Sequence, residues 1–331
     1  MRLSSKRFFP PLVLLILLVT PAIGYAASCT MQAELQPRDR EELSAAGGRL
    51  AVALTEQNQA ALKAALLPAV ADSWESISAQ AEAAAVLMKG GQIELRGIYL
   101  LDASTLAAPA DTQFFCTSSS GSVTVTLTMR ALPPGRYAVV LANAVGAPNA
   151  GQLGLILVWD GPGNGWKLGG LTVRPGALDG HDGVWWWTHA RELAKDGNPW
   201  AAWYAYETAR MLLLPLDILS SPNLEKLSAE QRAIKGSPQD AFPLQIPGGE
   251  RTWKIDVVRL DISMLHADLG VYYESTGVTD PAALHTEAMA VMSALLKAQP
   301  QLRENFHGLW AYAIKGDKTM PVTEQPMAQI P

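Results

Sequence analysis

The hydrophobic pattern of this chain changes its period at Gly90 and Gly91, and this change limits the folds that the chain can adopt. Before it, residues 38–89 place Leu, Val and Ala at helical spacing, which predicts α-helices. After it, apolar residues alternate with polar ones, most clearly over 122–129, which predicts strands with one buried face. Turn-rich loops such as 133–135 join these strands, so we expect an antiparallel meander of strands.

Helices followed by a meander are typical of an α+β roll, in which a curved antiparallel sheet packs around helices. The resemblance lies in Leu155-Ile-Leu-Val-Trp-Asp160, the glycine-rich hairpin after it, and Gly165-Trp-Lys-Leu168. On these segments, residues 39–175 resemble the nuclear-transport-factor-2-like (NTF2-like) superfamily and its SnoaL-type rolls. The resemblance implies a cone-shaped pocket, with an Asp, His or Tyr acid–base set in the enzymes and ligand binding or scaffolding in other members.

The closing strand of the predicted roll departs from the enzymes of that superfamily, because residues 168–174 contain neither His nor a carboxylate. The catalytic candidates are then Glu94, Tyr99 and Asp102, on an earlier strand. They would need to face the concave side of the sheet with shifted pKa values.

Residues 182–235 predict a helical segment that is rich in aromatic side chains. Asn198 and Pro199 are a typical helix start, and the spacing of small and aromatic residues over 183–215 resembles one tetratricopeptide-type hairpin. A single repeat cannot build a solenoid, so we expect the hairpin to pack between domains. Its tryptophans either fill that core or form an exposed binding edge: Trp185, Trp186, Trp187, Trp200 and Trp203.

The rest of the chain predicts a smaller unit. Residues 236–250 are rich in Pro and Gly and predict a linker, 251–315 predict a compact β-β-α-β unit, and 316–331 predict a flexible tail. The expected fold class is therefore α+β: helices packed on a curved antiparallel sheet over 38–178, then a helical hairpin and this small unit.

Residues 1–26 have the order of a secretory signal peptide, with basic residues first, an apolar run, and small residues before a cleavage point after Ala26. The apolar run is shorter than the roughly 20 residues that span a bilayer, and an uncleaved anchor is the alternative. We expect a water-soluble mature protein that is periplasmic or secreted.

The two cysteines, Cys29 and Cys116, both follow the signal. In an oxidising compartment an even pair predicts one disulfide, which ties the mature N-terminus to a later strand. The alternatives are a lipid anchor at Cys29, which follows Ala26-Ala27-Ser28, and two free thiols.

Charge and motifs exclude several functions. Signal removal takes away three of 26 basic residues and none of 31 acidic ones, which leaves a net charge of about −8 and argues against nucleic acid as a partner. The five histidines fit no metal motif, and the oxygen-rich stretches 160–164 and 179–182 fit no calcium loop. The sequence contains no phosphate loop, dinucleotide fingerprint or nucleophile elbow, so we expect no cofactor and no metal.

The function that we expect is that of an exported, non-enzymatic binding protein. It would recognise a partner protein or an apolar small molecule through the roll or the aromatic hairpin. The alternatives are a hydrolase or isomerase with an acid–base pair in the cone pocket, and a structural protein of the cell envelope.

Overall fold

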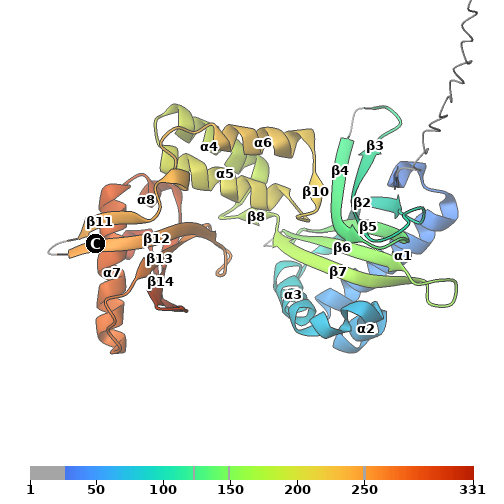
Figure 1. Cartoon of the computed structure of the whole chain (residues 1–331), viewed down its shortest axis with the longest axis horizontal. Helices are drawn as coiled ribbons and strands as arrows, with labels where there is room; N and C mark the ends of the chain where they lie inside the picture. Colours follow the sequence, from blue (N-terminus) through green and yellow to red (C-terminus); the bar gives the residue numbers. More distant parts are fainter. Residues whose placement is uncertain (1–26, 122–123, 148–149, 249–250) are drawn as a thin grey trace, which may run out of the picture.

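The computed structural model describes residues 27–121, 124–147, 150–248 and 251–331. Figure 1 shows three parts along the long axis: helices and strands at one end, a group of helices in the middle, and the C-terminal sheet with a long helix at the other end. The expected export signal lies outside the described residues. Across the part of the chain that is described, no helix is both long and apolar enough to cross a membrane.

Three helices and a five-stranded antiparallel sheet form the first part. The helices confirm the predicted helical stretch: α1 (Pro37–Thr55), α2 (Gln59–Ala65) and α3 (Trp74–Leu87). The sheet has the order β1-β2-β5-β6-β7 and consists of β1 (Ser28–Met31), β2 (Gln92–Asp102), β5 (Arg136–Val145), β6 (Gly151–Trp159) and β7 (Trp166–Pro175). Leu43 and Leu54 of α1 pack with Leu155 of β6 in the core between the helices and the sheet.

The predicted meander is interrupted, because the hairpin between β2 and β5 belongs to a second sheet. Its strands β3 (Ala110–Thr117) and β4 (Thr124–Leu132) pair with each other, and β4 also pairs with the short β10 (Leu219–Ser220). The alternation in the hairpin buries Phe114 and Leu127 against Val139 of β5, because the five-stranded sheet is apolar on both faces. Helices therefore cover one face of the first sheet, and the second sheet covers the other. As a name only, we call these helices and strands, residues 28–175, the roll.

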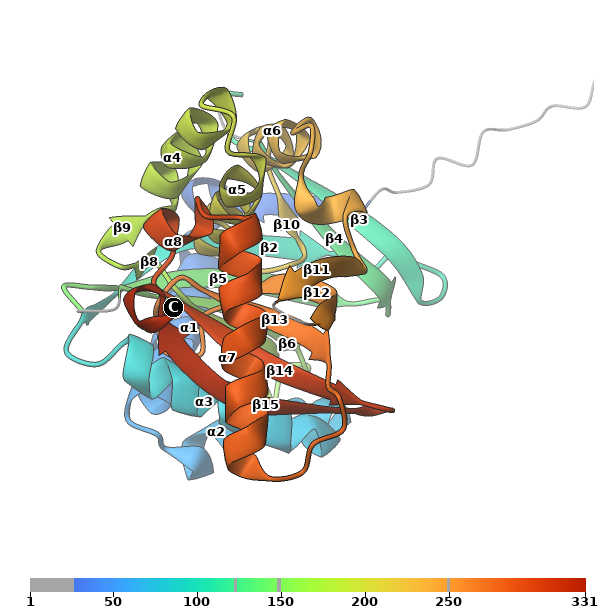
Figure 2. The same ribbon diagram turned by 90° about the vertical axis from the view of Figure 1, so that its left-hand side faces the viewer.

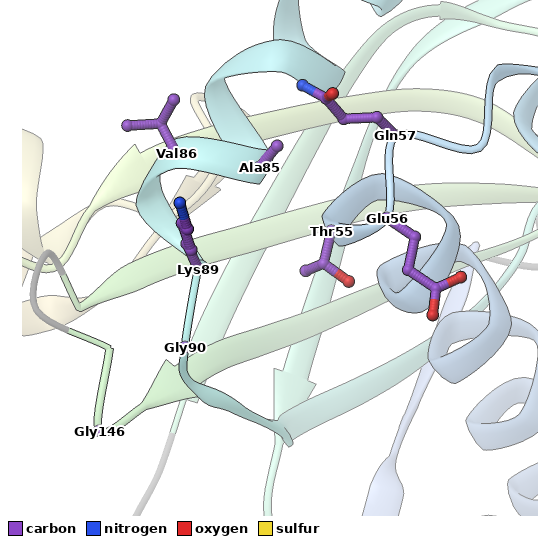
Figure 3. Close-up of a pocket in the computed structure, with 8 residues that line it drawn as sticks. All are labelled: Thr55, Glu56, Gln57, Ala85, Val86, Lys89, Gly90 and Gly146. Carbon is purple, nitrogen blue, oxygen red and sulfur yellow. The ribbon is translucent and has the colours of Figure 1, made fainter.

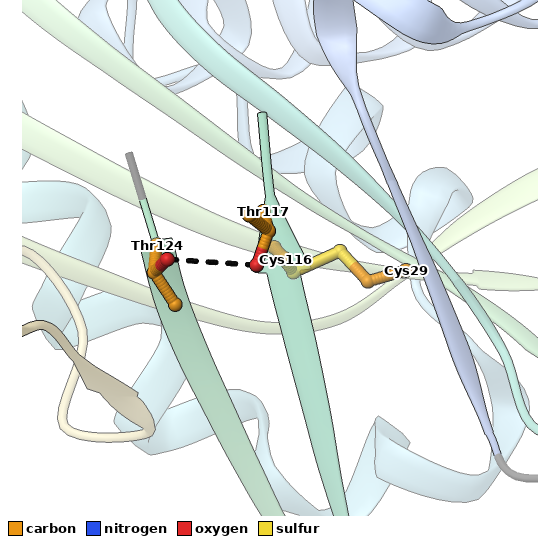
Figure 4. The surroundings of a disulfide bond; sticks show 4 residues. All are labelled: Cys29, Cys116, Thr117 and Thr124. Atoms are coloured by element: carbon orange, nitrogen blue, oxygen red, sulfur yellow. Dashed lines mark hydrogen bonds between the residues drawn. A yellow bond between two sulfur atoms is a disulfide. The ribbon is translucent and has the colours of Figure 1, made fainter. Parts of the chain in front are cut away.

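A disulfide between Cys29 of β1 and Cys116 of β3 joins the two sheets (Figure 4). This confirms the predicted pairing of the mature N-terminus with a later strand. Because the sulfur of Cys29 is bonded to Cys116, it is not free to carry a lipid, and the chain has no other cysteine.

The middle part consists of α4 (Gly183–Lys195), α5 (Pro199–Leu213) and α6 (Pro222–Arg232), preceded by the short strands β8 (Ala177–Leu178) and β9 (His181–Asp182). The side chain of Asp182 accepts a hydrogen bond from the backbone N–H of Trp185 at 2.8 Å and so caps α4. Asn198 occupies the N-cap position of α5, but its side chain makes no capping hydrogen bond.

The C-terminal part is one five-stranded sheet with α7 (Pro281–Ala298) lying across it (Figure 2). The sheet order is β11-β12-β13-β14-β15, and β13 and β14 are parallel while the other pairs are antiparallel. The strands are β11 (Leu244–Gly248), β12 (Arg251–Asp261), β13 (Asp268–Glu274), β14 (Gly308–Lys315) and β15 (Lys318–Pro326), with the short α8 (Leu302–Asn305) before β14.

Two strands of this sheet lie where the sequence predicts other structure. β11 lies in the expected linker, and β15 in the expected flexible tail. Both are edge strands of the sheet. Proline is tolerated at sheet edges because its missing N–H is not needed there, so Pro247 and Pro321 do not prevent strand pairing. The β-β-α-β unit is therefore extended by one strand at each edge.

Candidate functional site

The three catalytic candidates of the roll lie along β2 without meeting. Glu94 and Asp102 are eight positions apart on this strand, which is roughly 26 Å at strand spacing. Glu94 lies 3.5 Å from Arg96 in a surface ion pair. The Ser104 hydroxyl donates to Asp102 at 2.6 Å and lowers the pKa of that carboxyl, whereas burial raises the pKa of the Tyr99 phenol. The strand gives each group a separate environment and forms no acid–base pair from them.

One hollow of the roll lies between the C-terminal ends of α1 and α3 and has a volume of about 920 Å³. Figure 3 shows its lining: Thr55, Glu56, Gln57, Ala85, Val86, Lys89, Gly90 and Gly146. Ligand pockets are mostly apolar and contain a few converging polar groups. Here the apolar side chains are one valine and one alanine, so the lining offers little to an apolar ligand. A smaller hollow of about 420 Å³ borders Tyr99.

The five tryptophans of the helical segment differ in exposure. Trp186 and Trp200 are 3% and 5% exposed, and the ring of Trp186 stacks on Phe306 with 6.1 Å between the centroids. Trp203 is half-buried. Trp185 is 39% exposed. The difference between Trp185 and Trp186 follows from helix geometry, because consecutive side chains are about 100° apart. Trp185 is therefore the tryptophan of this group that a partner can reach.

Trp187 belongs to a polar network that joins α4 to α6. Its indole Nε1 donates to Glu230 at 2.8 Å, and Arg191 donates two hydrogen bonds to the same carboxylate at 2.8 and 2.9 Å. The Arg191 guanidinium also lies 4.3 Å from the centroid of the Trp187 ring. Hydrogen bonds from Arg191 are the main cause that lowers the pKa of Glu230. These contacts indicate that Trp187 holds the helices together.

Trp185 is held between histidines. Its indole stacks on His181, with 3.6 Å between centroids and 11° between planes, and on His189, at 4.7 Å and 26°. His189 Nε2 in turn donates to the Asn305 side chain at 2.8 Å. Beside it, Val184 is 59% exposed. We call the four residues His181, Val184, Trp185 and His189 the α4 edge.

A second group of histidines lies where the turn before α4 meets the C-terminal sheet. His266 and His307 stack with 3.8 Å between centroids and 12° between planes. Asp179 accepts hydrogen bonds from His266 Nδ1 at 2.6 Å and from the Ala267 backbone N–H at 2.8 Å. His307 Nδ1 donates to Asp268 Oδ1 at 2.9 Å. Each ring therefore has one nitrogen fixed by a carboxylate, which sets its orientation.

Two carboxyls next to these rings each have a buried oxygen without a partner. Asp268 is fully buried, and its Oδ2 has no hydrogen-bond partner among the described residues; the same holds for the buried Oε1 of Glu324. Desolvation raises the pKa of both carboxyls. Ligand atoms of Asp268, His307 and Glu324 lie within 4.8 Å of one another. We call these three residues the 268–307–324 cluster.

The sequence does not reveal this cluster, because its members are distant along the chain. Asp268 begins β13, His307 directly precedes β14, and Glu324 lies on β15. Pairing of β13 with β14 and of β14 with β15 brings them to one end of the sheet. A weak signal in the sequence was the nearness of His266, in the bend before β13, to Asp268 at the start of that strand.

No protein-family model matches this chain, and no curated protein or solved structure is significantly similar to it.

Proposed function

We propose that this chain is an exported binding protein that recognises a partner protein through the α4 edge. The observation that carries the proposal is the exposure of Trp185, at 39%, next to tryptophans that are buried. Large aromatic side chains dominate the binding energy of protein interfaces. The Cys29–Cys116 disulfide supports a location outside the cytoplasm, where such bonds persist.

The contacts of Trp185 support its role as an anchor. Stacking on His181 and His189 restricts the indole, and the hydrogen bond from His189 to Asn305 connects this stack to the C-terminal part. A side chain that is already ordered loses less conformational entropy when a partner covers it. The neighbouring Val184 extends the apolar surface, so we expect the partner to present an apolar side chain to this edge.

The other candidate functions have less support. A small-molecule site in the roll requires an apolar cavity, whereas packed side chains cover both faces of its five-stranded sheet, and the hollow of about 920 Å³ has few apolar lining groups. An acid–base enzyme requires converging groups, whereas Glu94 and Asp102 lie at opposite ends of β2. A structural envelope protein remains the alternative that experiment must separate from a specific binder.

Site-specific photocrosslinking in cells that naturally make the protein tests the proposal. A benzophenone amino acid is placed at Val184 of the full chain, with and without Trp185→Ala, and at Val52 of α1 as a control of similar exposure (48%). We expect a defined crosslinked protein at position 184 that is lost in Trp185→Ala and absent at position 52. Equal crosslinking at both positions, or crosslinking unaffected by Trp185→Ala, contradicts a specific α4 edge.

A further inference from the structure

The 268–307–324 cluster offers one nitrogen and two oxygen ligands from three neighbouring segments of the C-terminal sheet. We propose that Asp268, His307 and Glu324 bind a divalent transition-metal ion, with Zn²⁺ as the ion to test first. Imidazole and carboxylate groups are the usual nitrogen and oxygen ligands of Zn²⁺, and three protein ligands leave one coordination position open. This inference goes beyond the proposed binding function and does not depend on it.

Burial is the first argument for a cation. Asp268 is 0% exposed to solvent, and no donor among the described residues hydrogen-bonds to its Oδ2. The Oε1 atom of Glu324 is in the same situation. Burying a charged carboxylate oxygen without a partner is costly, and buried polar atoms normally have a partner. A metal ion between the two carboxylates would satisfy both oxygens at once.

The charges around the cluster give the second argument. Among the described residues, no Lys or Arg forms an ion pair with Asp268 or Glu324; the charged groups that act on them are His266, His307 and Asp179. No Lys or Arg of the described residues therefore balances the two acids, and a bound cation would do so.

The geometry around the cluster suits an ion. Ligands at about 2.1 Å from a tetrahedral ion lie roughly 3.4 Å apart, so binding an ion would shorten the present spread of up to 4.8 Å between the ligand atoms. Nδ1 of His307 lies 2.9 Å from Oδ1 of Asp268, and the ion would take the place of the hydrogen that these two atoms share. At Gly308, a Cβ atom would lie 2.8 Å from Glu324 Oε1 and 3.1 Å from Asp268 Oδ1. The glycine thus lets the backbone lie directly beside the ligand atoms.

Zinc binding to the mature chain tests the proposal. The protein is prepared without an affinity tag and with its disulfide intact, treated with a chelator, and titrated with Zn²⁺ by calorimetry. We expect one Zn²⁺ per chain, retained through gel filtration. Glu324→Gln is expected to weaken binding by roughly 100-fold, because even outer-shell partners of a metal change its affinity by about 10–100-fold. His285→Gln removes an exposed histidine of α7 outside the cluster and should leave the affinity unchanged.

Three results overturn the proposal: no binding, binding that Glu324→Gln does not weaken, and binding that His285→Gln weakens equally. Circular dichroism of each variant establishes that it is folded. If Glu324→Gln fails to fold, Co²⁺ added to the unmodified protein decides the question. Visible absorption of the bound ion, together with a shift of the His307 imidazole signals in NMR, supports the site, and the absence of either one overturns it.

Discussion

The Cys29–Cys116 disulfide gives a quantitative prediction about the stability of the roll. The two cysteines are 87 positions apart in the sequence. In the chain-entropy model, a cross-link that closes a loop of this length stabilises the folded state by about 4.6 kcal/mol at 25 °C. We therefore expect selective reduction of the bond to lower the free energy of unfolding of the roll by about 2–5 kcal/mol, since measured effects are often smaller than the model predicts.

Native-state hydrogen exchange of the oxidised and reduced protein measures this difference. The amides of β5 are the most informative, because β5 lies between β2 and β6 in the centre of the first sheet and exchanges only when the roll opens. The amides of α7 serve as the internal control. This helix packs in the core of the C-terminal part, which is separate from the cores of the roll.

One result would refute the entropic reasoning. β1 is a four-residue strand at the edge of the sheet, so reduction could free this strand while the rest of the roll stays closed. In that case only the amides of β1 and its neighbours in β2 exchange faster, and the protection of β5 changes by less than about 1 kcal/mol. The bond would then restrain a terminal strand rather than stabilise the whole roll.

Three further substitutions test the packing and the electrostatics. Glu230→Gln should lower the free energy of unfolding by about 1–2 kcal/mol at pH 7. Because Arg191 lowers the pKa of Glu230, this difference should disappear as the pH falls through the folded-state pKa. Urea titrations from pH 7 to pH 3 measure it, and a pH-independent difference would contradict the prediction. Gly154→Ala places a Cβ 2.4 Å from Leu216 Cγ and should cost about 1–3 kcal/mol through overpacking; an unchanged melting temperature would contradict this. Trp186→Ala should cost about 3–5 kcal/mol, because that side chain is 3% exposed, and a loss below about 1 kcal/mol in urea unfolding would show that the site collapses around the smaller residue.

The local features of the fold could be predicted from the sequence. The spacing of apolar residues predicts the helices of residues 38–89 and most of the strands that follow. Helical spacing and strand alternation both depend on near neighbours in the chain. The helix start at Asn198 and Pro199 is equally local, and α5 begins there. The disulfide could be predicted because the chain has only two cysteines.

The pairing of strands could not be predicted in the same way. A hairpin such as β3–β4 has the same alternation whether it continues the first sheet or packs over it, since the pattern shows that one face is buried and not which surface covers it. The proline-containing segments that form β11 and β15 predict a linker and a tail for a related reason. Proline excludes a central strand, but only the assembled sheet shows which strand lies at an edge.

The 268–307–324 cluster shows why a site can escape sequence analysis even when its residues are visible. Its position depends on the parallel pairing of β13 with β14, in which Leu269 lies opposite Leu309. That register places Asp268 beside His307, although α7 and α8 separate them in the sequence, and Glu324 joins through the antiparallel β15. A parallel pair always requires a long crossover connection, so ligands at the ends of its strands are never close in sequence. Motifs with short spacing therefore find metal sites within one turn or hairpin, whereas a site of this kind appears only when the strand register is known.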